Sequence, residues 1–170
     1  MDSSLKPDPR QKGSYYRRIE DVARALESLQ TDKLSETTLF LVYYFGCEKI
    51  ARGIVGIHGK LPATKAYHHN TRLRLEDIKA AAVALSLSVS QEELDWLFAD
   101  FNQQNLLRPP TNDWSSSARY LRNILSHDFG PSNVARIAKH APFHNPKMKL
   151  FLECVPQIHA YQHLHFDGVA

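Results

Sequence analysis

Three residues that can perform acid–base and phosphate chemistry lie close together late in the chain. Arg122, Asn123 and His127 fall within the segment RYLRNILSHDFGP, which spans residues 119–131. An arginine presents a fixed positive fork to phosphate oxygens, a histidine can exchange a proton near neutral pH, and an amide can orient either one. Such a set suits metal-free cleavage of RNA, because a histidine can deprotonate the 2′-hydroxyl while an arginine stabilises the charge on the phosphate.

An amphipathic helix is predicted to position these residues. It is expected to begin at Trp114, with Asn112 or Asp113 as its N-cap, and to stop at Gly130 and Pro131. At about 100° per residue, its apolar side chains fall on one arc and its polar side chains on the opposite arc. The polar stripe consists of Arg119, Arg122, Asn123, Ser126 and His127.

The two charged members of this stripe do not stack on one another. Arg122 and His127 lie about 140° apart around a helix, whereas Asn123 and His127 are one turn apart and share a face. Arg122 and His127 can reach one centre only from the two sides of a groove, or if the last turn unwinds. One histidine also cannot easily be both the base and the acid on opposite sides of a phosphate. We therefore expect two copies of the stripe to face each other across a two-fold axis.

An ordinary solvated helix surface is the alternative interpretation of the stripe. Arginine and histidine are common on the outer face of a helix, and a histidine in the last turn is favoured by the helix dipole. The spacing alone does not separate this interpretation from a functional one.

The run RNILSH at residues 122–127 resembles the signature of the HEPN superfamily. These proteins are all-α bundles, and many are metal-independent endoribonucleases that act as dimers, often as toxins or phage-defence effectors. The resemblance implies that Arg122 and His127 are catalytic, that Asn123 orients them, and that no cofactor or metal is needed. In architecture the resemblance covers most of residues 14–165, and recognisable identity is confined to the motif.

The resemblance extends to a second pair of charges and departs at one position. Glu48 and Arg52 have the spacing of an acidic–basic pair found in some HEPN families, although an ordinary helix ion pair is the favoured explanation of the spacing. Together with Arg119 and Ser126, they are predicted to contact RNA. HEPN toxins that are neutralised by tyrosine modification carry a tyrosine two residues after the histidine, where this chain has Phe129. A nucleotidyltransferase antitoxin is therefore not expected, and another inhibitor or antitoxin protein remains a candidate partner.

The fold class is predicted to be all-α, because no period-two alternation persists along the chain. Residues 1–13 are expected to form a disordered tail and residues 14–165 a single HEPN-like bundle of about six or seven helices. Ser35 and Ser90 are predicted helix N-caps, Gly53 and Gly56 are expected to loosen the end of the second helix, and 56–74 is expected to be a loop. The helices are predicted near 14–31, 36–55, 75–87, 91–101, 114–129 and 132–141, with a last helix from Pro146 that kinks at Pro156.

Composition favours a soluble, cytoplasmic protein of one domain. The chain has 170 residues, of which 43% are hydrophobic, and a net charge of +3 that is compatible with an RNA partner. Cys47 and Cys154 are too few for a disulfide framework and favour a reducing compartment. The first residues are polar, so no signal peptide is expected, and the apolar run 39–45 is too short to span a membrane.

Two other clusters are weaker candidates for chemistry. His159, His163 and His165 approach metal-ligand spacing, but no cysteine or carboxylate other than Asp167 accompanies them, so they favour a surface patch. The pair His68–His69 lies in a basic loop that either holds RNA backbone or is an ordinary exposed loop.

Two functions from different classes follow from these observations. The first is a HEPN-type endoribonuclease acting as a homodimer on RNA. The second is a non-catalytic module of the same fold that binds a nucleotide or RNA, or acts as a regulatory scaffold. Helical DNA binding is a weaker third, because no helix-turn-helix pair with a basic recognition helix stands out.

Overall fold

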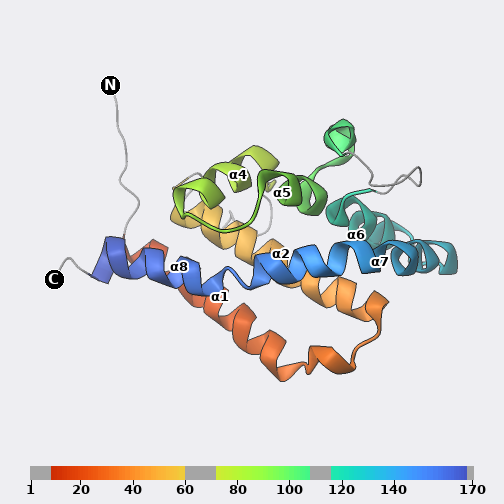
Figure 1. Ribbon diagram of the computed structural model, residues 1–170, viewed down its shortest axis with the longest axis horizontal. Coiled ribbons are helices and arrows are strands. Elements are labelled where there is room, and N and C mark those ends of the chain that lie inside the picture. Colours follow the sequence, from red (N-terminus) through yellow and green to blue (C-terminus); the bar gives the residue numbers. More distant parts are fainter. Residues whose placement is uncertain (1–8, 60–71, 108–115, 168–170) are drawn as a thin grey trace.

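The chain folds as an all-α bundle, as the sequence predicts (Figure 1). The computed structural model describes residues 9–59, 72–107 and 116–167, and within these ranges it contains seven α-helices and no strand. The α-helices are α1 (Pro9–Ser28), α2 (Glu36–Ile57), α4 (Leu75–Ala84), α5 (Gln91–Phe98), α6 (Ala118–His127), α7 (Pro131–Leu152) and α8 (Val155–Gln162). Shorter helical turns are η1 (Thr31–Lys33), η2 (Phe101–Leu106) and η3 (His163–Asp167). Among the helices described, none is both long and apolar enough to cross a membrane.

Helix α2 is the centre of the bundle, and α1 and α7 pack most extensively against it. Figure 1 shows α1 on one side of α2 and the pair α4 and α5 on the other. The predicted cap is confirmed, since the Ser35 hydroxyl accepts a hydrogen bond from the backbone nitrogen of Thr38 at 3.3 Å. Buried side chains occur on almost every side of α2, from Phe40 to Ile57, which is typical of a helix surrounded by others.

Two glycines of α2 allow α1 to approach closely. A Cβ atom at Gly53 would lie 2.7 Å from side-chain carbons of Ile19, and one at Gly56 would overlap the ring of Tyr15. The expectation that these glycines loosen the helix end is therefore wrong, because α2 continues to Ile57. Because these glycines have no side chain, residues of α1 can pack directly against the backbone of α2.

The first helix begins earlier than predicted. Helix α1 starts at Pro9, so residues 9–13 of the predicted tail are helical, while residues 1–8 lie outside the described part of the chain. Proline is well tolerated in the first turn of a helix, where its missing N–H would have no partner. The helix ends at Ser28, short of the predicted end at residue 31, and Leu29 is 49% exposed.

Helix α7 is one continuous helix, although the sequence predicts a break between two shorter ones. It contains Pro142 and Pro146, each of which costs about 3 kcal/mol in a helix interior. Tertiary contacts offset this cost. The side-chain nitrogen of Asn145 donates to the backbone oxygen of Glu36 at 3.0 Å and to the carboxylate of Glu36 at 2.7 Å. Both prolines lie on the exposed face, where water can satisfy the carbonyl groups that lose a partner.

The predicted kink at Pro156 is instead a break between two helices. Helix α7 ends at Leu152, and α8 starts at Val155 with Pro156 in its first turn. The predicted cap of α5 is confirmed, since Ser90 and Glu93 form a reciprocal capping box. Most of the predicted loop 56–74 lies outside the described residues.

Candidate functional site

Helix α6 carries the polar stripe, and Ser117 is its N-cap. The Ser117 hydroxyl accepts from the backbone nitrogen of Tyr120 at 3.1 Å and donates to the backbone oxygen of Ala99 at 2.6 Å. The prediction that Asn112 or Asp113 caps this helix is wrong. Each of these residue types can cap a helix, and the buried contact with Ala99 favours Ser117 over its neighbours.

The first arginine of the stripe is bonded to the interior of the protein. The Arg119 side chain donates to the backbone oxygens of Leu73 at 2.6 Å and Phe98 at 3.3 Å, and its Nε lies 3.1 Å from a carboxylate oxygen of Asp100. Only 13% of this side chain is exposed. Arg119 therefore joins α6 to the segment before α4 and to the end of α5. It presents little surface to the RNA that it was predicted to bind.

Arg122 is fixed from three sides. One guanidinium nitrogen donates to a carboxylate oxygen of Glu48 at 3.0 Å, and another donates to the side-chain oxygen of Asn123 at 2.9 Å. The guanidinium carbon lies 5.4 Å from the ring centroid of Tyr44 and 5.5 Å from that of Phe45. Such contacts hold the planar group in one orientation.

The Glu48 carboxylate lies between two arginines. It contacts Arg122 at 3.0 Å and Arg52 at 3.5 Å, and all three side chains are mostly covered. Burial, and then the charge of Glu48, raise the pKa of the Tyr44 hydroxyl, so this tyrosine is not an acid–base group near neutral pH. The predicted proximity of Glu48 to the stripe fits this geometry, whereas Arg52 lines a separate hollow between α1 and α2.

His127 borders a hollow on one side of α6. The hollow has a volume of about 430 Å³, and His127 is exposed at its rim. The other residues around it come from α6, from η2 and from the segments beside them: Arg72, Asp100, Phe101, Asn102, Tyr120, Asn123, Ile124 and Asp128.

Arg122 borders a different hollow, of about 410 Å³, on the other side of α6. Its walls are mostly apolar and include Phe45 and Phe129, which are 51% and 79% exposed. Ser126 lies at the same hollow, and its hydroxyl donates to the backbone oxygen of Asn123 at 2.9 Å.

The stripe is therefore divided between two sides of one helix. The last turn stays helical, since the backbone nitrogen of Asp128 donates to the oxygen of Ile124 at 3.0 Å. Unwinding, the alternative by which Arg122 and His127 could meet within one chain, does not occur. Asn123 connects the two sides, because it bonds Arg122 and also lines the hollow beside His127.

The aromatic side chains that line the His127 hollow were not predicted from the sequence. Phe101 was predicted to end a helix over residues 91–101, but α5 ends at Phe98 and Phe101 is 69% exposed on η2. Asp100 begins the next turn as the N-cap of η2, paired with Gln103. This box, an acidic residue with glutamine three positions later, was the available signal for a new turn.

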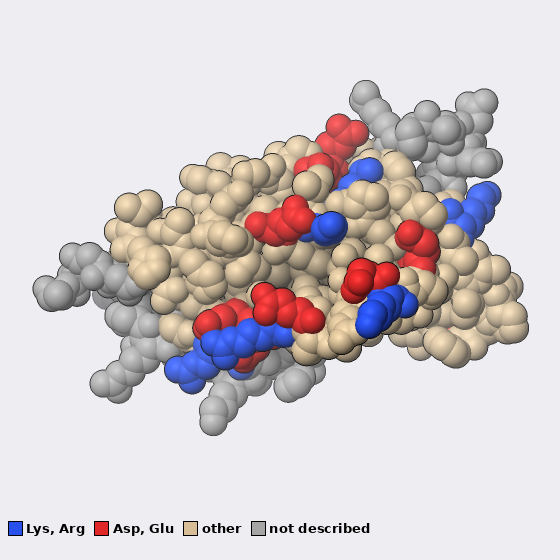
Figure 2. All heavy atoms as spheres, turned by 60° about the horizontal axis from the view of Figure 1, so that its bottom comes forward, with Lys and Arg blue, Asp and Glu red and all other residues tan. Residues whose placement is uncertain are grey.

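Within the described ranges, the remaining charges and histidines do not form a second site of the same kind. On the face shown in Figure 2, basic side chains lie beside acidic ones and do not gather into one basic field. No group of three or more His, Cys, Asp or Glu side chains in the described ranges could hold a metal ion, which covers His159, His163 and His165. His68–His69 lies outside those ranges.

Comparison with known proteins assigns no family to this chain. No protein-family model matches it, and no curated protein or solved structure matches it either.

Proposed function

We propose that this protein is a metal-independent endoribonuclease of the HEPN type that acts as a homodimer. One arrangement carries the proposal: an arginine fixed by Glu48 and Asn123, with an exposed histidine one turn beyond that asparagine. The resemblance of residues 122–127 to the HEPN motif supports the same function. With it we propose a role as a toxin or phage-defence effector, which an inhibitor protein would control.

The proposed reaction uses the two edges of the stripe for different steps. His127 takes the proton of the RNA 2′-hydroxyl, and that oxygen attacks the adjacent phosphorus. Arg122 stabilises the negative charge on the pentacoordinate phosphate. The bond to the 5′-oxygen breaks, and that oxygen receives a proton from His127 of the second copy. The products are a 2′,3′-cyclic phosphate and a 5′-hydroxyl, and the proton that one histidine gains is matched by the proton that the other loses.

The surface beside Arg122 supports a dimer. Phe45 and Phe129 are large apolar side chains that remain exposed next to the Arg122 hollow. Phe45 also borders a second apolar hollow between α1 and α2, where Leu29 is exposed. Continuous apolar surface of this kind is typical of a protein contact. A second copy seated there would bring another stripe close to Arg122.

Cleavage of RNA by the purified protein tests the proposed activity. We expect cleavage of a labelled RNA in the presence of EDTA, with cyclic-phosphate ends identified by mass spectrometry. His127→Ala and Arg122→Ala should each reduce the rate by about 10²-fold or more. His159→Ala is the matched control, because this histidine lies on α8 at the other end of the molecule (Figure 1). Cleavage that survives both substitutions would refute the proposal.

A charge placed on the apolar surface tests the dimer. Phe129→Glu should weaken self-association by about tenfold or more in analytical ultracentrifugation, because it places a carboxylate in the apolar contact. Cleavage should fall in parallel and recover at high protein concentration. Leu164→Glu on η3, where the side chain is 80% exposed against 79% for Phe129, is the control. A fully active monomer would contradict the composite site.

A non-catalytic RNA-binding or scaffold protein is the second candidate. The observation in its favour is that the charge of Arg122 is already paired with Glu48 within one chain. Binding of RNA that is weakened by Arg122→Ala, with no cleavage of single-stranded or structured RNA, would select this function.

A further inference from the structure

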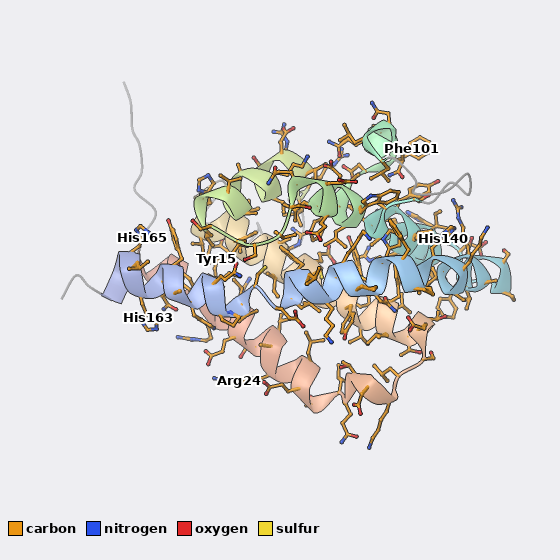
Figure 3. All side chains as sticks on the ribbon, viewed as in Figure 1. Tyr15, Arg24, Phe101, His140, His163 and His165 are labelled. Carbon is orange, nitrogen blue, oxygen red and sulfur yellow. The ribbon has the colours of Figure 1, made fainter. Side chains whose placement is uncertain are left out.

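Phe101 is an exposed aromatic side chain with no obvious role in the fold. It is 69% exposed, and Figure 3 shows it on η2, at the end of the molecule where α6 lies. Its ring centroid is 5.6 Å from that of Tyr120, at an interplanar angle of 34°. The pair forms a tilted stack of rings, one from η2 and one from α6, at the wall of the His127 hollow.

The backbone that carries Phe101 is held firmly. The backbone nitrogen of Asp100 donates to the side-chain oxygen of Gln103 at 3.1 Å, and the side-chain nitrogen of Gln104 donates to the backbone oxygen of Asp100 at 2.9 Å. The Asp100 carboxylate pairs with Arg119 of α6. An exposed ring on a fixed backbone loses little freedom when it binds a flat ligand.

The hollow beside this ring has the chemistry of a nucleobase site. Its volume of about 430 Å³ is in the usual range of ligand pockets. Phe101, Tyr120 and Ile124 supply apolar and aromatic surface. The Asn102 amide can donate to and accept from the edge of a base, and the Asn123 amide nitrogen can donate to it while the Asn123 oxygen accepts from Arg122.

We propose that this hollow binds one unpaired nucleobase of a single-stranded RNA, stacked on Phe101, beside the bond that His127 cleaves. The inference rests on the proposed ribonuclease function and adds a reason for substrate choice. Stacking tolerates any base but requires an unpaired one, because a base within a duplex has no free face. The protein should therefore act on single-stranded segments and leave duplexes intact.

Binding of an uncleavable oligonucleotide tests the subsite apart from catalysis. A fluorescent single-stranded 2′-deoxy oligonucleotide lacks the attacking hydroxyl, and fluorescence anisotropy reports its dissociation constant. Phe101→Ala should weaken binding by about tenfold, the usual effect of losing one base–aromatic stack. Phe101→Tyr should bind like the wild type. Val83→Ala, which truncates a side chain on α4 that is 67% exposed, should also have no effect.

Phe101→Leu separates stacking from simple apolar contact. Leucine keeps an apolar side chain but has no aromatic face, so it should bind the oligonucleotide almost as weakly as the alanine variant. Wild-type binding by the leucine or alanine variant would overturn the subsite. An exposed position should not affect folding, and circular dichroism of each variant checks this.

The cleavage assay on the same variants distinguishes failure of the inference from failure of the proposed function. If the wild type cleaves RNA and Phe101→Ala has the same KM, the ribonuclease function is supported and the subsite is refuted. If Phe101→Ala loses oligonucleotide binding but the wild type cleaves no RNA, the subsite is supported and the ribonuclease function is refuted. A duplex of the same sequence that binds as tightly as the single strand would overturn the stacking model.

Discussion

The first and the last turns of α6 have similar polar residues and very different surroundings. In the first turn, Ser117 is fully buried and Arg119 is bonded to two backbone carbonyls and to Asp100. In the last turns, Ser126 and His127 are exposed. Arg122 is held there by hydrogen bonds to side chains and by none to the backbone that the structure describes.

This difference teaches that a polar stripe on a helix can combine two roles. Arg119 and Arg122 are three residues apart and look equivalent in the sequence. One satisfies carbonyl groups that would otherwise be buried without a partner, which stabilises the fold. The other lines an open hollow with a side chain that is 25% exposed, so an anionic ligand can approach it. Substitutions at the two positions should therefore affect different measurements.

The largest expected effect is on cleavage, from Arg122→Lys. Lysine keeps the positive charge but cannot contact Glu48 and Asn123 at once with a planar fork. We expect the cleavage rate to fall by about 10²- to 10³-fold with little change in the urea midpoint. Arg52→Lys is the matched control, since it keeps the charge on the other side of Glu48. Equal losses in the two variants would mean that Glu48, rather than Arg122, controls activity.

A smaller effect, on stability, is expected from Arg119→Ala. This change leaves two carbonyl groups and part of a carboxylate without a donor, and it should lower the free energy of unfolding by about 3 kcal/mol. Urea denaturation gives this value. Arg24→Ala removes an exposed ion pair with Glu20 and should cost less than about 0.5 kcal/mol. If Arg119→Ala abolished cleavage by a fully folded protein, the contrast between the two turns would be wrong.

The smallest expected effect is on the pH dependence of the free energy of unfolding. It arises from His144, which contacts the residue before the N-cap of α6. His144 is fully buried, and its Nε2 lies 2.8 Å from the backbone oxygen of Ser116, next to the N-cap of α6. Burial lowers the pKa of His144 from 6.5 to about 3. The unfolded chain therefore binds a proton below about pH 6.5 that the folded chain does not bind.

Because only the unfolded chain binds this proton, lowering the pH favours the unfolded state. As the pH falls from 7 to 5, the free energy of unfolding should drop by about 2 kcal/mol through His144 alone. His144→Phe should remove that part of the drop, because phenylalanine does not titrate. Urea midpoints of both proteins at pH 7 and pH 5 measure it. An identical drop in the variant would show that other groups cause the acid sensitivity.

Much of the fold could be predicted because its signals are local. Ser35 and Ser90 were identified as caps from residue type and spacing alone, and both cap their helices. The predictions failed where distant contacts decide. The continuity of α7 depends on Asn145 bonding Glu36, more than a hundred residues away in the chain. The start of α6 depends on Ser117 bonding Ala99.

The candidate site could be predicted only as far as helix periodicity extends. The angle between Arg122 and His127 follows from a regular helix, and the two hollows on either side of α6 agree with it. Nothing in the spacing indicated that Arg119 is used internally or that Phe101 stands exposed at the wall of the hollow. Both depend on segments that lie beside α6 only after folding.

The close packing of α1 against α2 has a consequence for how the protein tolerates sequence change. Gly53 directly follows Arg52, and Glu48 lies little more than one turn earlier on the same helix. A Cβ atom at Gly53 would overlap the fully buried side chain of Ile19, so Ile19 or α1 would have to move, and any displacement of α2 would reach Glu48 and, through it, Arg122. In a random library selected for activity, we expect position 53 to accept almost nothing but glycine. A residue that touches no substrate would thus be among the least replaceable in the chain.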